Sequence, residues 1–116
     1  MSTIARVDEA WQGDVPVATV TGEVDASNAV DVGDRLRALV TNHLQAMVVD
    51  LSTVTYLDSA GLNLLFALGE QLRGRQQQLA IVVREGSPIA RMIAITGLGL
   101  KVVVRPSLDE AIAGVT

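Results

Sequence analysis

The sequence contains no cysteine, and only 3% of its residues are aromatic. Without cysteine the chain forms no disulfide, no thiolate nucleophile and no cysteine metal site. Its aromatic residues, Trp11, Tyr56 and Phe66, are too few for a platform on which nucleic-acid bases or sugars stack. Since hydrophobic residues still make up 49% of the chain, we expect a core of Val, Leu, Ile and Ala.

Basic charge is also scarce, with 9 Lys and Arg against 13 Asp and Glu and a net charge of −4. The basic residues are scattered along the chain. Nucleic-acid binding generally requires a basic stripe that displaces counterions from phosphates. We therefore expect no direct nucleic-acid partner, whereas the mild acidity suits a partner with a basic docking face.

Long hydrophobic runs are missing as well. The longest apolar stretch, Leu64 to Leu68, is far short of the ~20 residues that span a bilayer. Residues 1–6 lack the charged and apolar regions of a signal peptide. These features predict a cytoplasmic protein without membrane insertion, and the length predicts a single domain over residues 1–116.

The sequence also lacks the common catalytic motifs: a Gly-x-Ser-x-Gly elbow, a Gly-rich phosphate loop and a His-Glu-x-x-His helix. Its one histidine, His43, is predicted late in the first helix, on or near the apolar face, as a packed or helix-end residue. Nothing in the sequence places this histidine near a nucleophile. We therefore expect neither an enzyme nor a metal site.

The hydrophobic pattern predicts an opening hairpin, with strands over residues 3–11 and 15–22. Helices and strands then alternate. Helices are predicted over residues 29–43, from Ser59 for about four turns, over 87–96 and after Ser107, and strands over 46–51, 78–83 and 101–104. This order predicts a layered α/β domain with a mixed, largely parallel sheet and about four helices.

The most informative stretch is residues 57–62, Leu-Asp-Ser-Ala-Gly-Leu, where Ser59 opens the second helix. Unpaired N–H groups and the helix dipole favour negative charge there, so a phosphate on Ser59 would meet stabilising donors. The alternative is that Asp58 or Ser59 is simply the helix N-cap. Gly61 costs ~1 kcal/mol relative to Ala in a helix, which close approach of another backbone or a partner would explain.

Two further segments carry two interpretations each. Asp25, after the second strand, either caps the first helix, with Ser27 and Asn28 as rivals, or forms an acidic loop beside Ser59 at the same sheet edge. The third helix is apolar around more of its circumference than a half-buried helix needs. It is either buried in the core or carries an exposed patch, including Met92, that docks a partner.

In combination these segments resemble the STAS family (sulfate transporter and anti-sigma factor antagonist), most closely its bacterial anti-sigma factor antagonists. The matching segments are residues 21–25 (Thr-Gly-Glu-Val-Asp), 48–51, 57–62, 87–98 and the strand 101–104. The resemblance implies a STAS-like layered fold and a non-enzymatic, cytoplasmic regulator of transcription. The unphosphorylated form of such a protein binds a serine-kinase anti-sigma factor and frees the sigma factor. The kinase then phosphorylates it, and a phosphoserine phosphatase reverses this step.

Residue by residue, the resemblance implies that Ser59 is the phosphoacceptor, Asp58 its acidic neighbour and Asp25 the acidic residue of the nearby loop. The expected partner-binding residues are Asp25, Asp58, Ser59, Ala60, Gly61, Asn63 and Met92. ATP belongs to the kinase, so neither a cofactor nor a metal is expected, and the chain is expected to be a monomer or weak dimer. The alternative function is a non-enzymatic STAS subunit of a membrane transport assembly, such as a lipid-trafficking ABC transporter, which needs no serine kinase.

Overall fold

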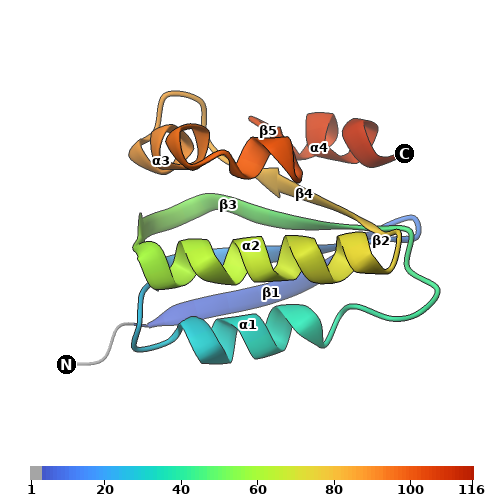
Figure 1. The fold of residues 1–116 in the computed structure, drawn as a ribbon, viewed down its shortest axis with the longest axis horizontal. Helices are drawn as coiled ribbons and strands as arrows, with labels where there is room; N and C mark the ends of the chain where they lie inside the picture. The colour runs from blue at the N-terminus through green and yellow to red at the C-terminus, as the bar shows by residue number, and fades with distance from the viewer. Residues whose placement is uncertain (1–3) are drawn as a thin grey trace.

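The computed structural model describes residues 4–116 around a five-stranded sheet of order β1-β2-β3-β4-β5 (Figure 1). In chain order the elements are β1 (Ala5–Gln12), β2 (Val15–Val24), α1 (Ala29–Arg37), β3 (Ala46–Leu57), α2 (Ser59–Gly74), β4 (Gln78–Val82), α3 (Pro88–Thr96), a 3-10 turn η1 (Leu98–Leu100), β5 (Val103–Arg105) and α4 (Leu108–Val115). β1 and β2 are antiparallel and all other neighbours are parallel. The predicted α/β class, opening hairpin and mixed sheet are therefore confirmed.

The central strands bury both of their faces. On β4, Leu79 and Ile81 join a large cluster with α1, α2 and α3, whereas Ala80 and Val82 join a smaller cluster under Ala111 of α4. Figure 1 shows α1 and α2 side by side along one face of the sheet, with α4 across the sheet from them. Because successive side chains of a strand point to opposite faces, strands covered on both faces read as continuous hydrophobic runs.

The helix boundaries set by local signals agree with the prediction. Ser87 caps α3 by accepting a hydrogen bond at Oγ from the Ala90 N–H at 3.1 Å, with Pro88 at the first position. Gly97, with φ of 81°, ends α3 in the left-handed conformation. Ser107 caps α4 by accepting from the Glu110 N–H at 3.2 Å.

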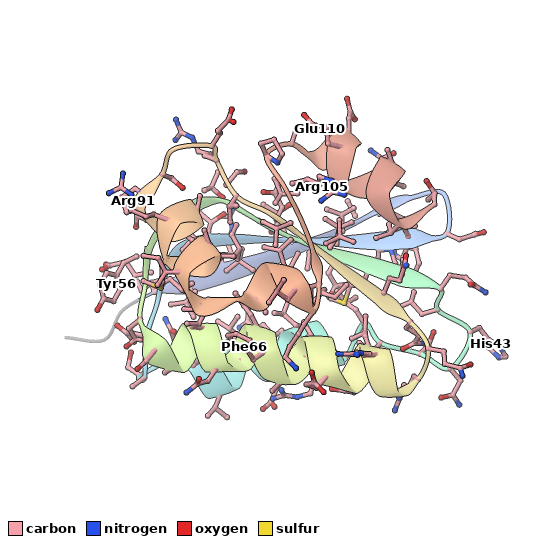
Figure 2. All side chains as sticks on the ribbon, turned by 45° about the horizontal axis from the view of Figure 1, so that its top comes forward. His43, Tyr56, Phe66, Arg91, Arg105 and Glu110 are labelled. Atoms are coloured by element: carbon pink, nitrogen blue, oxygen red, sulfur yellow. The ribbon has the colours of Figure 1, made fainter. Side chains whose placement is uncertain are left out.

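The first helix is shorter than predicted, and His43 does not lie on it. α1 ends at Arg37, after which the Leu39 N–H bonds to the Leu36 carbonyl oxygen in a tighter i to i−3 pattern. Leu39 is buried and Val40 is half-buried although both follow the helix, so their apolar spacing imitated a longer helix. His43 is exposed in this loop and projects from the molecule in Figure 2, so its predicted place on a helical apolar face is wrong.

β3 is longer than predicted, because its polar half stays paired with β2 after the apolar run ends. Thr53 donates its Oγ1 hydrogen to the Val20 carbonyl at 3.1 Å, and Thr55 donates to the Gly22 carbonyl at 3.3 Å. Pairing of β3 with β4 ends at Asp50, whereas pairing with β2 continues to Leu57. This extension carries the chain directly to the start of α2.

α2 ends in a Schellman motif whose left-handed residue is not glycine. The Gln77 N–H bonds to the Leu72 carbonyl at 2.8 Å, and the Gln76 N–H bonds to the Arg73 carbonyl at 3.0 Å. Gln76 has φ of 60°, a conformation that glycine adopts without the steric conflict of a Cβ atom.

We predict that Gln76→Gly raises the free energy of unfolding by about 0.5–1 kcal/mol, because it removes this conflict. The matched control is Gln71→Gly inside the same helix, where loss of helix propensity should lower it by about 1 kcal/mol. Urea denaturation of the two variants measures both values. Equal destabilisation by both substitutions would contradict the assignment of Gln76 as a left-handed cap.

Candidate functional site

The ends of β2 and β3 lie side by side, which brings two strand-to-helix junctions together. Val24 pairs with Leu57 as the last residues of the two parallel strands. The chain then turns into residues 25–28 on one side and into Asp58 and Ser59 on the other. The Asp58 N–H donates to the Val24 carbonyl at 3.3 Å, so the first residue beyond β3 is tied to the end of β2.

The Asp58 carboxylate connects these two junctions. Its Oδ1 accepts from the Ala60 N–H at 2.9 Å and from the Gly61 N–H at 3.1 Å, so Asp58 is the N-cap of α2. Its Oδ2 accepts from the Ala26 N–H at 3.3 Å. A negative charge at a helix N-terminus is favourable, and here it also holds the neighbouring loop.

Ser59 is the first residue of α2, and it is exposed. Its hydroxyl makes no hydrogen bond with any of residues 4–116, because Asp58 fills the capping role. The expectation that a phosphate here would meet unpaired donors is wrong for the N–H groups of Ala60 and Gly61, which Asp58 already occupies. The site therefore combines an accessible hydroxyl with a neighbouring carboxylate. A phosphate on that hydroxyl would compete with the carboxylate for the N–H groups of Ala60 and Gly61.

The loop at residues 25–28 is held by its own side chains. Asp25 Oδ1 accepts hydrogen bonds from the N–H and the hydroxyl of Ser27, and the Asp25 carbonyl accepts from the N–H of Ala29 at 2.8 Å. Asn28 Oδ1 accepts from the Asp25 N–H at 3.0 Å, while Asn28 Nδ2 donates to the Glu23 carbonyl at 2.8 Å. Asp25 thus forms a side-chain turn beside α2, and neither Asp25 nor Asn28 caps α1 with its side chain.

Gly61 is buried against the ends of the two strands. A Cβ atom there would overlap Leu57 Cδ1 and lie 3.1 Å from Val24 Cγ1. The absence of a side chain therefore allows α2 to approach β2 and β3 closely. Close packing within the chain accounts for this glycine, and its expected contact with a partner stays a prediction.

The outer surface at this end includes Tyr56, an exposed aromatic residue to which the sequence analysis gave no role. Asn63 is exposed and Ala60 is half-buried on the first turns of α2. Tyr56 is 49% exposed and pairs in register with the exposed Glu23 of β2. Its place three residues before Ser59, in a chain with few aromatic residues, was the available signal.

α3 is buried on one side and exposed on the other, whereas docking of a partner on its exposed side stays a prediction. Ile89 and Ile93 are buried in the core, whereas Ile95 is 79% exposed. Met92 is half-buried and lines a hollow of about 300 Å³ together with Arg91 and Ile95. Both views place α3 at the end of the molecule where α2 begins (Figures 1 and 2). An apolar patch thus lies at the same end as Ser59.

The rest of the described chain adds no reactive centre to this end. Among residues 4–116 no cluster of His, Cys, Asp and Glu is suited to hold a metal ion, and no helix is long and apolar enough to cross a membrane. His43 lies at the opposite end of the molecule from Tyr56 (Figure 2). The pKa of Glu70 is lowered by its hydrogen bond and ion pair with Lys101, three turns along α2 from Ser59.

Comparison with known proteins gives one family and several relatives. The family model described as "Mlab, STAS domain" matches residues 7–105. The anti-sigma-F factor antagonist RsfB of Mycobacterium tuberculosis is 33% identical over 101 residues, which cover 87% of this chain and 81% of that protein. The anti-sigma-B factor antagonist of Listeria monocytogenes is 33% identical over 79 residues, which cover 68% of each protein.

A solved structure agrees with these matches. The crystal structure of an anti-sigma factor antagonist from Mycobacterium paratuberculosis superposes with a TM-score of 0.86 at 31% identity, covering 97% of this chain and 94% of that one. The structure of SpoIIAA in its unphosphorylated form superposes with a TM-score of 0.69 at 14% identity, covering 94% and 96% of the two chains. The second match concerns the fold alone.

We predict that Asp58→Ala lowers the free energy of unfolding by about 1–2 kcal/mol, because the cap of α2 is lost. Ser59→Ala should change the free energy of unfolding by no more than about 0.5 kcal/mol, since the exposed hydroxyl is not hydrogen-bonded to any described residue. Thermal or urea denaturation of both variants tests this difference. A larger loss for Ser59→Ala than for Asp58→Ala would show that Ser59 is the cap.

We also predict that Gly61→Ala lowers the free energy of unfolding by about 1 kcal/mol or more, because overpacking against Leu57 and Val24 outweighs the gain in helix propensity. Gly74→Ala in the last turn of the same helix is the matched control. A Cβ there meets nothing within 4 Å, so this change should stabilise the protein by up to about 1 kcal/mol. Equal stabilisation by both changes in urea denaturation would refute the packing role of Gly61.

Proposed function

This chain belongs to the STAS domain family, as its motifs predicted, and on that premise we propose that it acts as an anti-sigma factor antagonist controlled by phosphorylation of Ser59. In the unphosphorylated form it binds a serine-kinase anti-sigma factor, which then releases its sigma factor. The observation that carries the proposal is the exposed Ser59 hydroxyl, which makes no hydrogen bond with the described residues. It lies beside Asp58, whose carboxylate joins the start of α2 to the loop at residues 25–28. It occurs in a chain with two curated relatives that are named antagonists.

The proposed chemistry is divided between the chain and its partner. The Ser59 oxygen forms a bond to the γ-phosphorus of an ATP that the kinase holds, and the bond from that phosphorus to ADP breaks. The hydroxyl proton leaves to a base of the kinase. The chain itself supplies an accessible acceptor and a docking shape, and needs no cofactor. A phosphoserine phosphatase hydrolyses the phosphate ester and restores the binding form.

The proposed docking surface joins the residues that the sequence singled out around Ser59. It consists of Asp25, Asp58, Ser59, Ala60 and Asn63, together with the outer face of α3 at Met92. Gly61 is buried beneath this surface, and the absence of a side chain there allows α2 to pack closely against the strands. A phosphate on Ser59 adds about −1.5 to −2 charge next to the Asp58 carboxylate. Burying that charge against a partner is unfavourable, which ends the interaction.

The second function predicted from the sequence, a STAS subunit of a membrane transport assembly, makes the opposite prediction for Ser59. Such a subunit needs no serine kinase, and the state of this hydroxyl would not control its binding. The same end of the molecule would then contact the assembly whatever the state of Ser59. The two functions are therefore separated by how binding responds to a charge at Ser59.

We expect that wild type and Ser59→Ala each capture a small serine-kinase anti-sigma factor from lysate of the source organism. Ser59→Asp should bind that purified kinase at least ~100-fold more weakly, because it places a charge in the interface. Gln78→Glu is the matched control, since it adds a negative charge at an exposed position at the start of β4. Calorimetric titration with the purified kinase measures the affinities.

Unchanged affinity of Ser59→Asp would rule out control by phosphorylation at this residue. If all forms capture a permease and an ABC ATPase instead, the chain is a transporter subunit. Ser59 would then be an ordinary first residue of a helix that Asp58 caps.

A further inference from the structure

We propose that Asp58 is a positioning residue that carries the effect of a phosphate on Ser59 to the loop at residues 25–28. The inference rests on the proposed function only in that Ser59 becomes phosphorylated. It adds that phosphorylation changes the shape of the docking surface as well as its charge. The partner would therefore lose contacts on both strand-to-helix junctions, although only one of them is modified.

The inference rests on the Asp58 carboxylate, whose two oxygens accept hydrogen bonds from different segments. Asp58 Oδ1 accepts from the N–H groups of Ala60 and Gly61, at 2.9 and 3.1 Å. Asp58 Oδ2 accepts from the Ala26 N–H at 3.3 Å. The two oxygens move together, so a change at the helix end changes the bond to the loop.

A phosphate on Ser59 would compete for the donors that Asp58 holds. It would stand at the first position of α2, one residue from Asp58, with Ala60 and Gly61 as the next two N–H groups. Its three acceptor oxygens and higher charge make it the stronger ligand for a helix N-terminus. Like charge also repels the Asp58 carboxylate. Both effects move Asp58 away from its cap and weaken its bond to Ala26.

The loop is built to respond as a unit. Its internal hydrogen bonds, among Asp25, Ser27 and Asn28, do not involve Asp58 and would survive the displacement. The Ala26 N–H bond links the side chain of Asp58, the N-cap of α2, to this loop. Its loss would therefore shift residues 25–28 relative to α2 without unfolding them.

The test uses the full chain with phosphoserine incorporated at position 59, in a wild-type background and with Asp58→Asn or Asp50→Asn. Asparagine caps helices about as well as aspartate, so Asp58→Asn keeps the cap and removes the charge. Asp50→Asn is the matched control, because Asp50 also accepts a local N–H bond, from Ser52 at 2.9 Å, but is not bonded to the loop. Amide NMR spectra are compared with and without the phosphate.

In the wild-type and Asp50→Asn backgrounds we expect the phosphate to shift the amides of Ala26, Ser27 and Asn28 as well as those of Ala60 and Gly61. In Asp58→Asn the shifts of the loop amides should be lost and those of the helix amides retained. Loop amides that do not respond in wild type, or that respond equally in Asp58→Asn, would overturn the relay. The wild-type comparison needs no variant, so loop amides that do not respond there would overturn the relay even where Asp58→Asn fails to fold.

A phosphorus NMR titration gives a readout that a merely structural role would not move. A neighbouring carboxylate raises the second pKa of the phosphate above its usual value of about 6. This pKa should fall in Asp58→Asn and stay unchanged in Asp50→Asn, and an equal pKa in all three backgrounds would contradict the proposed competition. None of these measurements involves a kinase. Failure of the relay and failure of the proposed kinase binding are therefore distinguishable.

Discussion

The Asp58 carboxylate accepts hydrogen bonds from both strand-to-helix junctions at the functional end, and the arrangement of that end depends on it. The carboxylate is in position because β2 and β3 run parallel and end together at Val24 and Leu57. The extension of β3 through its threonine residues makes this possible, since a strand ending with the apolar run would stop short of Val24. Gly61 then lets the capped helix pack closely against both strand ends.

These features are the basis of the switch that we propose for a chain with little reactive chemistry. Its contribution is an exposed hydroxyl at the first position of a helix whose capping is already complete. The surrounding residues hold two loops and an apolar helix face at one end of the molecule. In the proposed function, a partner that supplies the nucleotide and the catalytic base recognises this surface and modifies it. Negative charge added at Ser59 would act where the N–H groups of Ala60 and Gly61 already donate to Asp58.

The sequence predicted helix ends well where capping residues mark them. It predicted them poorly where buried residues outside a helix continue the apolar spacing of that helix. The caps at Ser87 and Ser107 depend on neighbouring N–H groups, so their prediction needed no tertiary information. Leu39 and Val40 pack against the core from beyond the end of α1, so their spacing extended this helix in the prediction and misplaced His43. The polar end of β3 was missed because Thr53 and Thr55 are stabilised by carbonyl groups of β2, about thirty residues earlier.

By itself the sequence determined the α/β class, the order of elements, the family and the pair Asp58 and Ser59 as the start of a helix. These properties follow from hydrophobic periodicity and from capping chemistry, which act over a few residues. Only the tertiary structure decided which of the pair is the cap, why residue 61 is glycine and which group connects the start of α2 to the loop at residues 25–28. The second and third of these depend on the parallel register of β2 with β3, which brings Val24 and the loop after it against the start of α2.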